Sequence, residues 1–271
     1  MSDSGSIAVA VAQFAPTGDA AANLGTMAEM TRLAAGRGAR VLVFPEYSSY
    51  FVEPFDDSLA ANAEILDGPF VAALTRLAAD TKTHIVAGMI ERTDRGRVRN
   101  TVIAVNESGL QAKYRKQHLY DAFGQRESDW IEAGDLGETS AATFPVEGLR
   151  FGLMTCYDLR FPEVTRTLVD AGSDVIVVPA EWVRGPLKEH HWRTLIQARA
   201  IENTVYLVAA DHPPPLGVGH SMIVDPAGVQ RASVGTGTDI AIGYLDRDSI
   251  DRIRRVNPAL ELRRYQVIPA S

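Results

Sequence analysis

The sequence predicts an α/β fold in which two β-sheets pack face to face between outer helices, a four-layer α-β-β-α sandwich. Apolar strand-like runs alternate with helix-like runs in two broad parts of the chain, and short strand spacing inside each part indicates antiparallel hairpins. Two packed sheets covered by helices accommodate this mixture better than a single parallel sheet does. Because no linker-like composition interrupts the 271 residues, we expect one domain over residues 1–271.

The first part of the chain supplies strands that end at turn residues. The run from Val41 to Phe44 is apolar at every position, as strands buried on both faces are, and a proline stops it. We expect strands at 7–14, 41–44, 84–90, 98–105 and 110–114, and helices at 23–35 and 70–81. Helical spacing predicts that the first helix has an inward side made by Leu24, Met27, Met30 and Leu33.

The second part of the chain repeats this alternation. We expect strands at 151–155, 174–178, 205–210, 220–224 and 239–245, and helices at 187–201 and 247–255. The segment 121–137 is rich in glycine and aspartate and reads as a long loop, which is often functional. Three consecutive prolines make 211–219 a loop as well, because proline lacks a backbone donor. The tail from about 256 to 271 is expected to pack on the domain or on a dimer partner.

Composition narrows the class of protein. Hydrophobic residues make up 46% and charged residues 23%, as in ordinary globular proteins. The formal net charge of −7 argues against nucleic-acid binding, which needs a basic surface. No apolar run approaches the length of a membrane span, and the first residues do not resemble a signal peptide. With one cysteine, nothing requires an oxidising compartment. We therefore expect a cytoplasmic protein without a nucleic-acid or membrane partner.

The single cysteine, Cys156, follows a short apolar strand and precedes a polar turn and a proline that can open a helix. This order lifts the side chain off a strand end, and a helix N-terminus nearby favours a thiolate. A lone cysteine is more often a small buried hydrophobe, so residue type alone favours a structural role. Because Cys156 lies at the polar end of the strand, a role as nucleophile is as well supported as a structural role.

Glu46 and Lys116 also come just after apolar strands, so the three side chains could share a pocket. Taken singly, the glutamate reads as a solvated loop residue and the lysine as part of a wet surface turn. Together they fit one chemistry: the carboxylate takes the thiol proton, and the ammonium, with the N–H of Tyr157, holds an oxyanion. The adjacent pair His190 and His191 does not have metal-ligand spacing, and we expect no metal.

Six sequence blocks, in this order, resemble the nitrilase or carbon–nitrogen hydrolase superfamily over most of the chain, from about Ile7 to Tyr265. They are Gly38 to Glu46, Tyr114 to Leu119, Thr155 to Glu163, Pro179 to Trp182, His191 to Asn203 and Gly219 to Pro226. The resemblance implies the same sandwich fold, pairing into homodimers or higher homo-oligomers through helices near the cysteine, and no cofactor.

The resemblance also implies residue roles. Glu46 is then the general base, Lys116 the oxyanion cation and Cys156 the nucleophile. Glu127 matches a second acid that orients Lys116 and the substrate amide. Trp182, as pocket wall or core, and Tyr120 are further candidates for substrate contact. The acidic and basic residues that follow the cysteine, Asp158, Arg160 and Glu163, are expected to fix the turn through ion pairs.

The motif from Cys156 to Glu163 is similar to that of amidases that act on short aliphatic amides or ω-amides. The expected reaction converts a small non-peptide carboxamide into a carboxylic acid and ammonia through a cysteine thioester. The loop from Tyr120 to Ser128 is shorter than in ω-amidases, and Ala227 stands where those enzymes carry tryptophan. The alternatives are a nitrilase, an N-carbamoyl hydrolase or an acyl transferase with the same triad, or a catalytically silent binding protein on the same scaffold.

Overall fold

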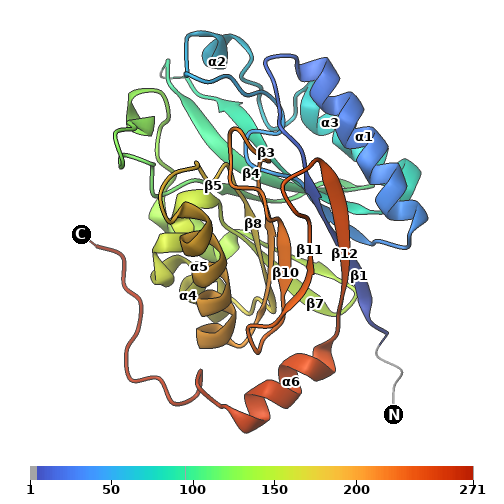
Figure 1. Cartoon of the computed structure of the whole chain (residues 1–271), viewed down its shortest axis with the longest axis vertical. Helices are drawn as coiled ribbons and strands as arrows, with labels where there is room; N and C mark the ends of the chain where they lie inside the picture. Colours follow the sequence, from blue (N-terminus) through green and yellow to red (C-terminus); the bar gives the residue numbers. More distant parts are fainter. Residues whose placement is uncertain (1–4, 95, 271) are drawn as a thin grey trace.

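Two six-stranded sheets face each other at the centre of the molecule, and helices cover the outer face of each (Figure 1). The structure is a computed structural model that describes residues 5–94 and 96–270. Side chains from both sheets share one buried cluster, which includes Val9 and Val43 of the first sheet and Val177 and Val208 of the second. This arrangement confirms the predicted α-β-β-α sandwich.

The first sheet has the strand order β12-β1-β2-β3-β4-β5. Its strands are β1 (Ile7–Gln13), β2 (Val41–Val43), β3 (His84–Arg92), β4 (Val98–Asn106), β5 (Gly109–Arg115) and β12 (Asp239–Leu245). β2 is parallel to β1 and β3, whereas β4 is antiparallel to both β3 and β5. β2 and β5 therefore run in the same direction, and β4 begins at the edge of the sheet where they end.

Helices α1 (Ala20–Gly36) and α3 (Pro69–Thr81) cover the first sheet, and a short helix α2 (Ser58–Ala61) lies in the loop between β2 and α3. Met27 on α1 and Leu74 on α3 pack in one cluster with Leu42 of β2. The prediction that Leu33 faces inward was wrong, because its side chain is 45% exposed. Burial instead follows Met27, Met30 and Ala34, which repeat at helical spacing.

The second sheet has the order β11-β10-β9-β8-β7-β6. Its strands are β6 (Thr143–Val146), β7 (Leu149–Leu153), β8 (Val175–Pro179), β9 (Tyr206–Ala210), β10 (Met222–Val224) and β11 (Gln230–Ser233). β7, β8 and β9 are parallel and buried at every position but one in β7. The sequence did not predict β6 or β11. Both are edge strands of four residues, and β11 has no buried residue that would give it an apolar pattern.

Helices α4 (Pro162–Asp170) and α5 (Lys188–Asn203) cover the second sheet, and α6 (Arg247–Val256) follows β12. Three 3₁₀ helices lie in the connections: η1 (Glu127–Asp129), η2 (Leu136–Ala141) and η3 (Cys156–Arg160). The segment 121–137, predicted as an irregular loop, thus contains η1 and the start of η2. No helix in residues 5–94 or 96–270 is long and apolar enough to span a membrane.

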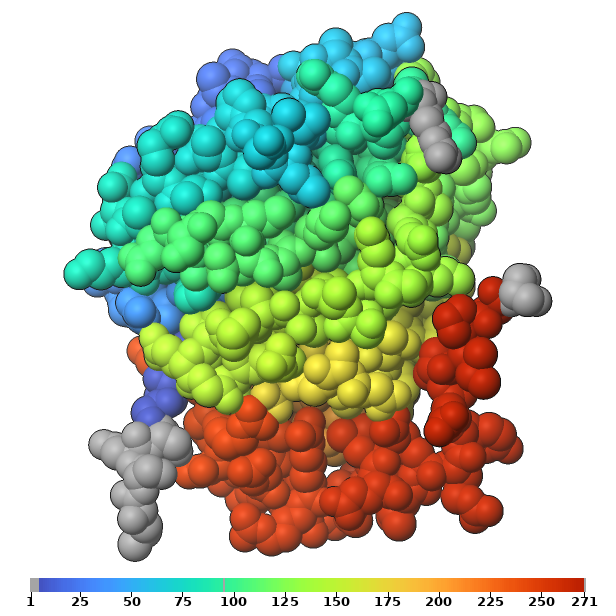
Figure 2. All heavy atoms as spheres, turned by 180° about the vertical axis from the view of Figure 1, so that it is seen from behind, coloured from blue at the N-terminus to red at the C-terminus, as the bar shows by residue number. Residues whose placement is uncertain are grey.

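The tail after α6 runs along one side of the molecule. Figure 2 shows α6 and the tail, in red, at the base and rising beside the body. Leu260 packs against the main core, and Nη1 of Arg263 lies 2.6 Å from Oδ1 of Asp170, whereas Tyr265 is 91% exposed. The expected homo-oligomer, the dimer contact of the tail and the cytoplasmic location stay predictions.

Candidate active site

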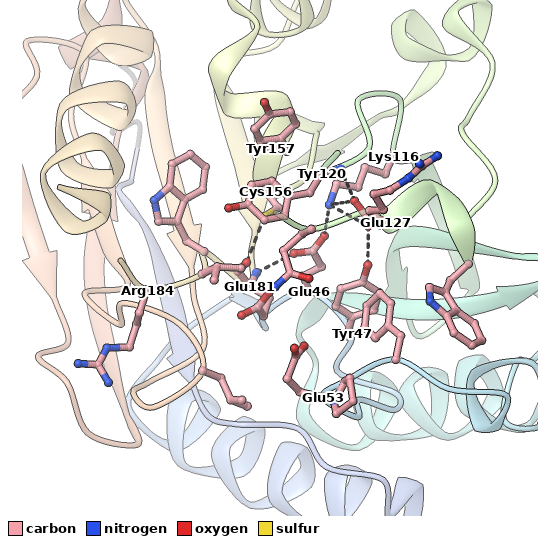
Figure 3. A pocket seen from close by; sticks show the side chains of 18 of the residues that line it. Glu46, Tyr47, Glu53, Lys116, Tyr120, Glu127, Cys156, Tyr157, Glu181 and Arg184 are labelled. Carbon is pink, nitrogen blue, oxygen red and sulfur yellow. Dashed lines mark hydrogen bonds and ion pairs between the residues drawn. The ribbon is translucent and has the colours of Figure 1, made fainter. Parts of the chain in front are cut away.

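Strand ends from both sheets bring the predicted site residues together in one pocket (Figure 3). Glu46 lies just beyond β2 and Lys116 directly follows β5, so both leave the same edge of the first sheet. Cys156 comes from the second sheet, as the first residue of η3 after β7. Glu127, the first residue of η1, reaches the same place from the long loop after β5. Because the two sheets pack face to face, these residues are neighbours in space although they lie far apart in the sequence.

Lys116 is the centre of a buried cluster of charges. Its Nζ lies 2.9 Å from Oε1 of Glu46 and 2.9 Å from Oε2 of Glu127, and all three side chains are at most 5% exposed. Burial opposes the charged ammonium, but Glu127 and Glu46 outweigh it and raise the pKa of Lys116 well above its ordinary value. The lysine is therefore a fixed positive charge at neutral pH.

Glu127 is held as a carboxylate by its donors. Oε1 accepts the hydroxyl of Tyr47 at 2.6 Å, and Oε2 accepts the backbone N–H of Tyr120 at 2.6 Å. Burial alone would raise the pKa of Glu127, yet Lys116 and the tyrosine hydroxyl lower it below its ordinary value. Glu127 does not face solvent, because the residue is only 6% exposed.

Glu46 has the opposite tendency. Its Oε2 accepts the backbone N–H of Glu181 at 2.6 Å, and Oε1 accepts an N–H of Asn100 at 2.6 Å. Burial raises the pKa of Glu46, the Lys116 ammonium lowers it, and the nearby Glu127 charge raises it, with a net rise. A carboxylate with a raised pKa binds a proton more readily, which is the property of a general base.

Cys156 has a φ of 46°, in the left-handed region that few non-glycine residues adopt. Its Sγ donates a weak hydrogen bond to the backbone carbonyl of Glu181 at 3.4 Å. Burial, and after it the negative charge of Glu46, raises the pKa of the thiol well above its ordinary value. A helix N-terminus nearby was expected to favour a thiolate, but burial and the nearby carboxylate act in the opposite direction and raise the pKa of the thiol.

Several residues in the cluster were missed by the sequence analysis. Asn100 also lies 3.2 Å from Oε1 of Glu127. His212, just after β9, donates its Nε2–H to the carbonyl of Glu46 at 2.8 Å, and burial lowers its pKa to about 4, so the ring is neutral. Glu181 follows β8 and His212 follows β9, so the strand-end argument used for the other residues would also have found these two.

The cluster opens into a cavity of about 450 Å³. Tyr120, Tyr157 and Trp182 line it together with Cys156. The indole of Trp182 serves both as wall and as core, because it is 3% exposed and its Nε1 donates to the carbonyl of Lys188 at 2.9 Å. A cavity of this volume is typical of small-molecule sites.

The sequence predicted that Arg160 fixes the turn after the cysteine through an ion pair, and this prediction was wrong. Its guanidinium lines the cavity, 4.8 Å from the centre of the Trp182 ring, and neither Arg160 nor Glu163 forms an ion pair with another described residue. Asp158 stabilises the turn by accepting the hydroxyl of Tyr114 at 2.9 Å and the backbone N–H of His118 at 3.0 Å. Across residues 5–94 and 96–270, no three His, Cys, Asp or Glu side chains gather as metal ligands.

Comparison with known proteins places this chain in a family. The family model described as carbon-nitrogen hydrolase matches residues 8–255. The chain is 35% identical over 257 residues to the deaminated glutathione amidase of Escherichia coli O157:H7, covering 95% of this chain and 97% of that protein. It is 31% identical over 271 residues to the human protein of the same name, covering 94% of this chain and 82% of that one.

Solved structures agree with these matches. Nit3 of Saccharomyces cerevisiae, a member of branch 10 of the nitrilase superfamily, superimposes with a TM-score of 0.84 at 28% identity, covering 96% of this chain and 97% of that one. The NitFhit protein of C. elegans gives a TM-score of 0.85 at 27% identity, over 96% of this chain and 65% of that one. The chain therefore belongs to the carbon–nitrogen hydrolase family of the nitrilase superfamily, whose enzymes hydrolyse carbon–nitrogen bonds other than peptide bonds.

Proposed function

We propose that the chain is an amidase that hydrolyses small ω-amides, carboxamides whose acyl chain ends in a carboxylate, through a thioester on Cys156. The observation that carries the proposal is the buried cluster of Glu46, Lys116 and Glu127 beside the only thiol of the chain, at the wall of an open cavity. Amidase-named relatives at 31% and 35% identity support the reaction type.

In the first half of the proposed reaction, Glu46 takes the proton of the Cys156 thiol and the sulfur attacks the amide carbon. A carbon–sulfur bond forms, and the electron pair of the carbonyl moves onto oxygen. The Lys116 ammonium and the backbone N–H of Tyr157 hold that oxyanion. Glu46 then gives its proton to the amide nitrogen, the carbonyl re-forms and the carbon–nitrogen bond breaks. Ammonia departs, and the acyl group remains on Cys156 as a thioester.

In the second half, water enters where ammonia left. Glu46 takes a proton from the water, and the oxygen of the water attacks the thioester carbon. The Lys116 ammonium and the backbone N–H of Tyr157 hold the second oxyanion. The carbon–sulfur bond breaks, the sulfur receives the proton from Glu46, and the carboxylic acid leaves. Glu127 remains ionised throughout, which its lowered pKa allows, and keeps the ammonium of Lys116 in place.

Two cations in the cavity support a substrate with a carboxylate. Lys188 is 6% exposed, and its Nζ donates to the hydroxyl of Tyr120 at 2.6 Å and lies 3.6 Å from the ring centre of Phe123. Burial and the neighbouring Arg160 lower the pKa of Lys188. Neither cation forms an ion pair with an acid in the described part of the chain. Two neighbouring cations without an ion-pair partner are costly, and an anionic group on the substrate would neutralise them.

The test is ammonia release from glutaramate, the monoamide of glutaric acid, compared with pentanamide, which has the same carbon chain without the acid. We expect kcat/KM for glutaramate to be higher by about a hundredfold, as for a partly buried charge pair. Lys188→Met keeps the length of the side chain and removes the charge, so it should lower that ratio. Cys156→Ala should abolish turnover of both amides. Equal turnover by Cys156→Ala and the wild type would refute the mechanism.

A further inference from the structure

The cavity has a second, acidic side formed by Glu53 and Glu181. Glu53 belongs to the loop after β2, and in Figure 3 its carboxylate points into the pocket toward the labelled Glu46. Glu181 follows β8, and its backbone already contacts both Glu46 and Cys156. Those contacts involve only the backbone of Glu181, and no step of the proposed reaction uses its side chain.

Neither acid forms an ion pair with a cation within residues 5–94 and 96–270. The guanidinium of Arg184 lines the same cavity, but Figure 3 shows it pointing away from Glu53. Arg126 at the rim is 3.5 Å from Asp129. Neither the acidic side nor the cationic side formed by Arg160 and Lys188 is therefore ion-paired within the described residues, although the charge of Glu181 acts on Lys188 across the cavity and opposes the lowering of its pKa by burial.

The surroundings of Glu181 agree with this description. Burial, then the charges of Glu46, Asp211 and Glu53, raises the pKa of Glu181 well above its ordinary value. The charge of Lys116 opposes this rise without cancelling it, so the carboxyl group of Glu181 binds a proton more readily than an ordinary glutamate. A ligand that brought a positive charge would allow the group to ionise and would itself be stabilised by the pair.

The position of Glu46 relates this acidic side to the leaving group. In the proposed reaction Glu46 protonates the departing nitrogen, so that nitrogen must lie beside it. Across Figure 3 the labelled side chains run from Tyr157 and Tyr120, past Cys156 and Glu46, to Glu53. The acyl chain would extend toward the tyrosines and the cationic side, and a substituent on the nitrogen would extend toward the acidic side.

We infer that the chain also hydrolyses N-substituted ω-amides whose leaving amine carries a second positive charge, such as a diamine acylated at one end, with Glu53 and Glu181 binding the distal ammonium group. The inference rests on the proposed function and adds a leaving-group subsite to it. The apolar side chains of Phe55 and Leu216 line the cavity and would contact the methylene chain between the two nitrogens. The bond changes are those given above, except that the departing molecule is a primary amine in place of ammonia.

The experiment compares four amides of glutaric acid and measures the release of glutarate. The nitrogen is unsubstituted, or carries an aminobutyl group, a pentyl group of the same length, or a carboxybutyl group. We expect kcat/KM for the aminobutyl amide to exceed that for the pentyl amide by about tenfold, and the carboxybutyl amide to be the slowest, because its charge meets two acids.

Variants assign the effect to the two acids. Glu53→Gln and Glu181→Gln keep the shape of the side chains and should each lower the ratio of the aminobutyl to the pentyl amide. Glu53 is exposed and its variant should fold even if the change at Glu181 disturbs the backbone beside Glu46. Asp129→Asn removes another carboxylate that lines the cavity, one already paired with Arg126, and should leave the ratio unchanged.

The outcomes separate the inference from the proposed function. Turnover of glutaramate with no preference for the aminobutyl over the pentyl amide would overturn the leaving-group subsite and leave the ω-amidase proposal standing. A preference that survives both Gln variants would also overturn the assignment to Glu53 and Glu181. Absence of turnover for all four amides would overturn both proposals.

Discussion

The side-chain amide of Asn100 donates to Oε1 of Glu46 at 2.6 Å, so a neutral group contacts the proposed general base within a cluster of charges. Asn100 lies near the start of β4, and its backbone carbonyl accepts the backbone N–H of Lys116 at 2.9 Å. Because β4 runs opposite to β5, its first residues lie where β5 ends. The asparagine therefore sets the position of Glu46 without adding a charge to the site.

The first prediction replaces this amide with an acid. Asn100→Asp adds a third carboxyl group to the one ammonium of Lys116, and the like charge should raise the pKa of Glu46 further. We expect kcat/KM for glutaramate to fall by about a hundredfold or more, with the acidic limb of its pH profile moved to higher pH. Asn106→Asp is the matched control at the other end of β4, where Oδ1 only accepts the N–H of Ser108 at 2.8 Å. A full-rate Asn100→Asp enzyme would contradict this role.

The second prediction concerns the protonation of Cys156. Because burial and then Glu46 raise the pKa of the thiol, alkylation by a neutral reagent should be slow at neutral pH and should accelerate only above the range of an ordinary thiol. In Glu46→Gln the loss of the negative charge should move that acceleration to lower pH, while hydrolysis of the amide is lost. The measurement is the alkylation rate against pH followed by mass spectrometry. A thiol that alkylates rapidly at neutral pH in the wild type would show that a preformed thiolate exists.

The third prediction compares two ion pairs. Glu127→Gln weakens the buried contact with Lys116 and should lower the free energy of unfolding by about 3 kcal/mol, because a buried charge loses a partner. Glu147→Gln breaks the pair with Arg40, whose side chains are 47% and 45% exposed, and should cost less than about 1 kcal/mol. Urea unfolding of both variants measures the difference. Similar losses in the two would mean that burial of the Lys116 cluster contributes nothing to stability.

The fourth prediction concerns the close contact between β3 and the loop after β2. A Cβ atom added at Gly88 would lie 2.5 Å from the backbone N of Tyr47 and 2.7 Å from the Cα of Glu46, so the backbone of the proposed base would have to move. Gly88→Ala should therefore reduce kcat by about a hundredfold, since a shift of 1 Å can cost that much. Gly36→Ala, where nothing lies within 4 Å of the added atom, is the matched control for kcat and thermal stability. Normal kcat in Gly88→Ala would show that the loop tolerates the shift.

The sequence predicted the sandwich because its strongest signals are local. Runs such as Val175–Pro179 are apolar at every position, which both predicts a strand and predicts its burial. The weakest signals belong to segments whose conformation depends on a neighbour. β11 has no fully buried residue, and Leu33 is apolar but lies off the inward side of α1. Hydrophobicity alone cannot identify these, because pairing and packing decide them.

The candidate site divides in the same way. The sequence by itself determined that an acid, an ammonium and the one thiol follow apolar strands, at Glu46, Lys116 and Cys156, and its motifs determined the family. Only the tertiary structure decided their charges, their partners and the two charged sides of the cavity. The physical reason is that a pKa depends on burial and on charges nearby in space. The fold supplies both, because it brings together side chains from different strands and loops.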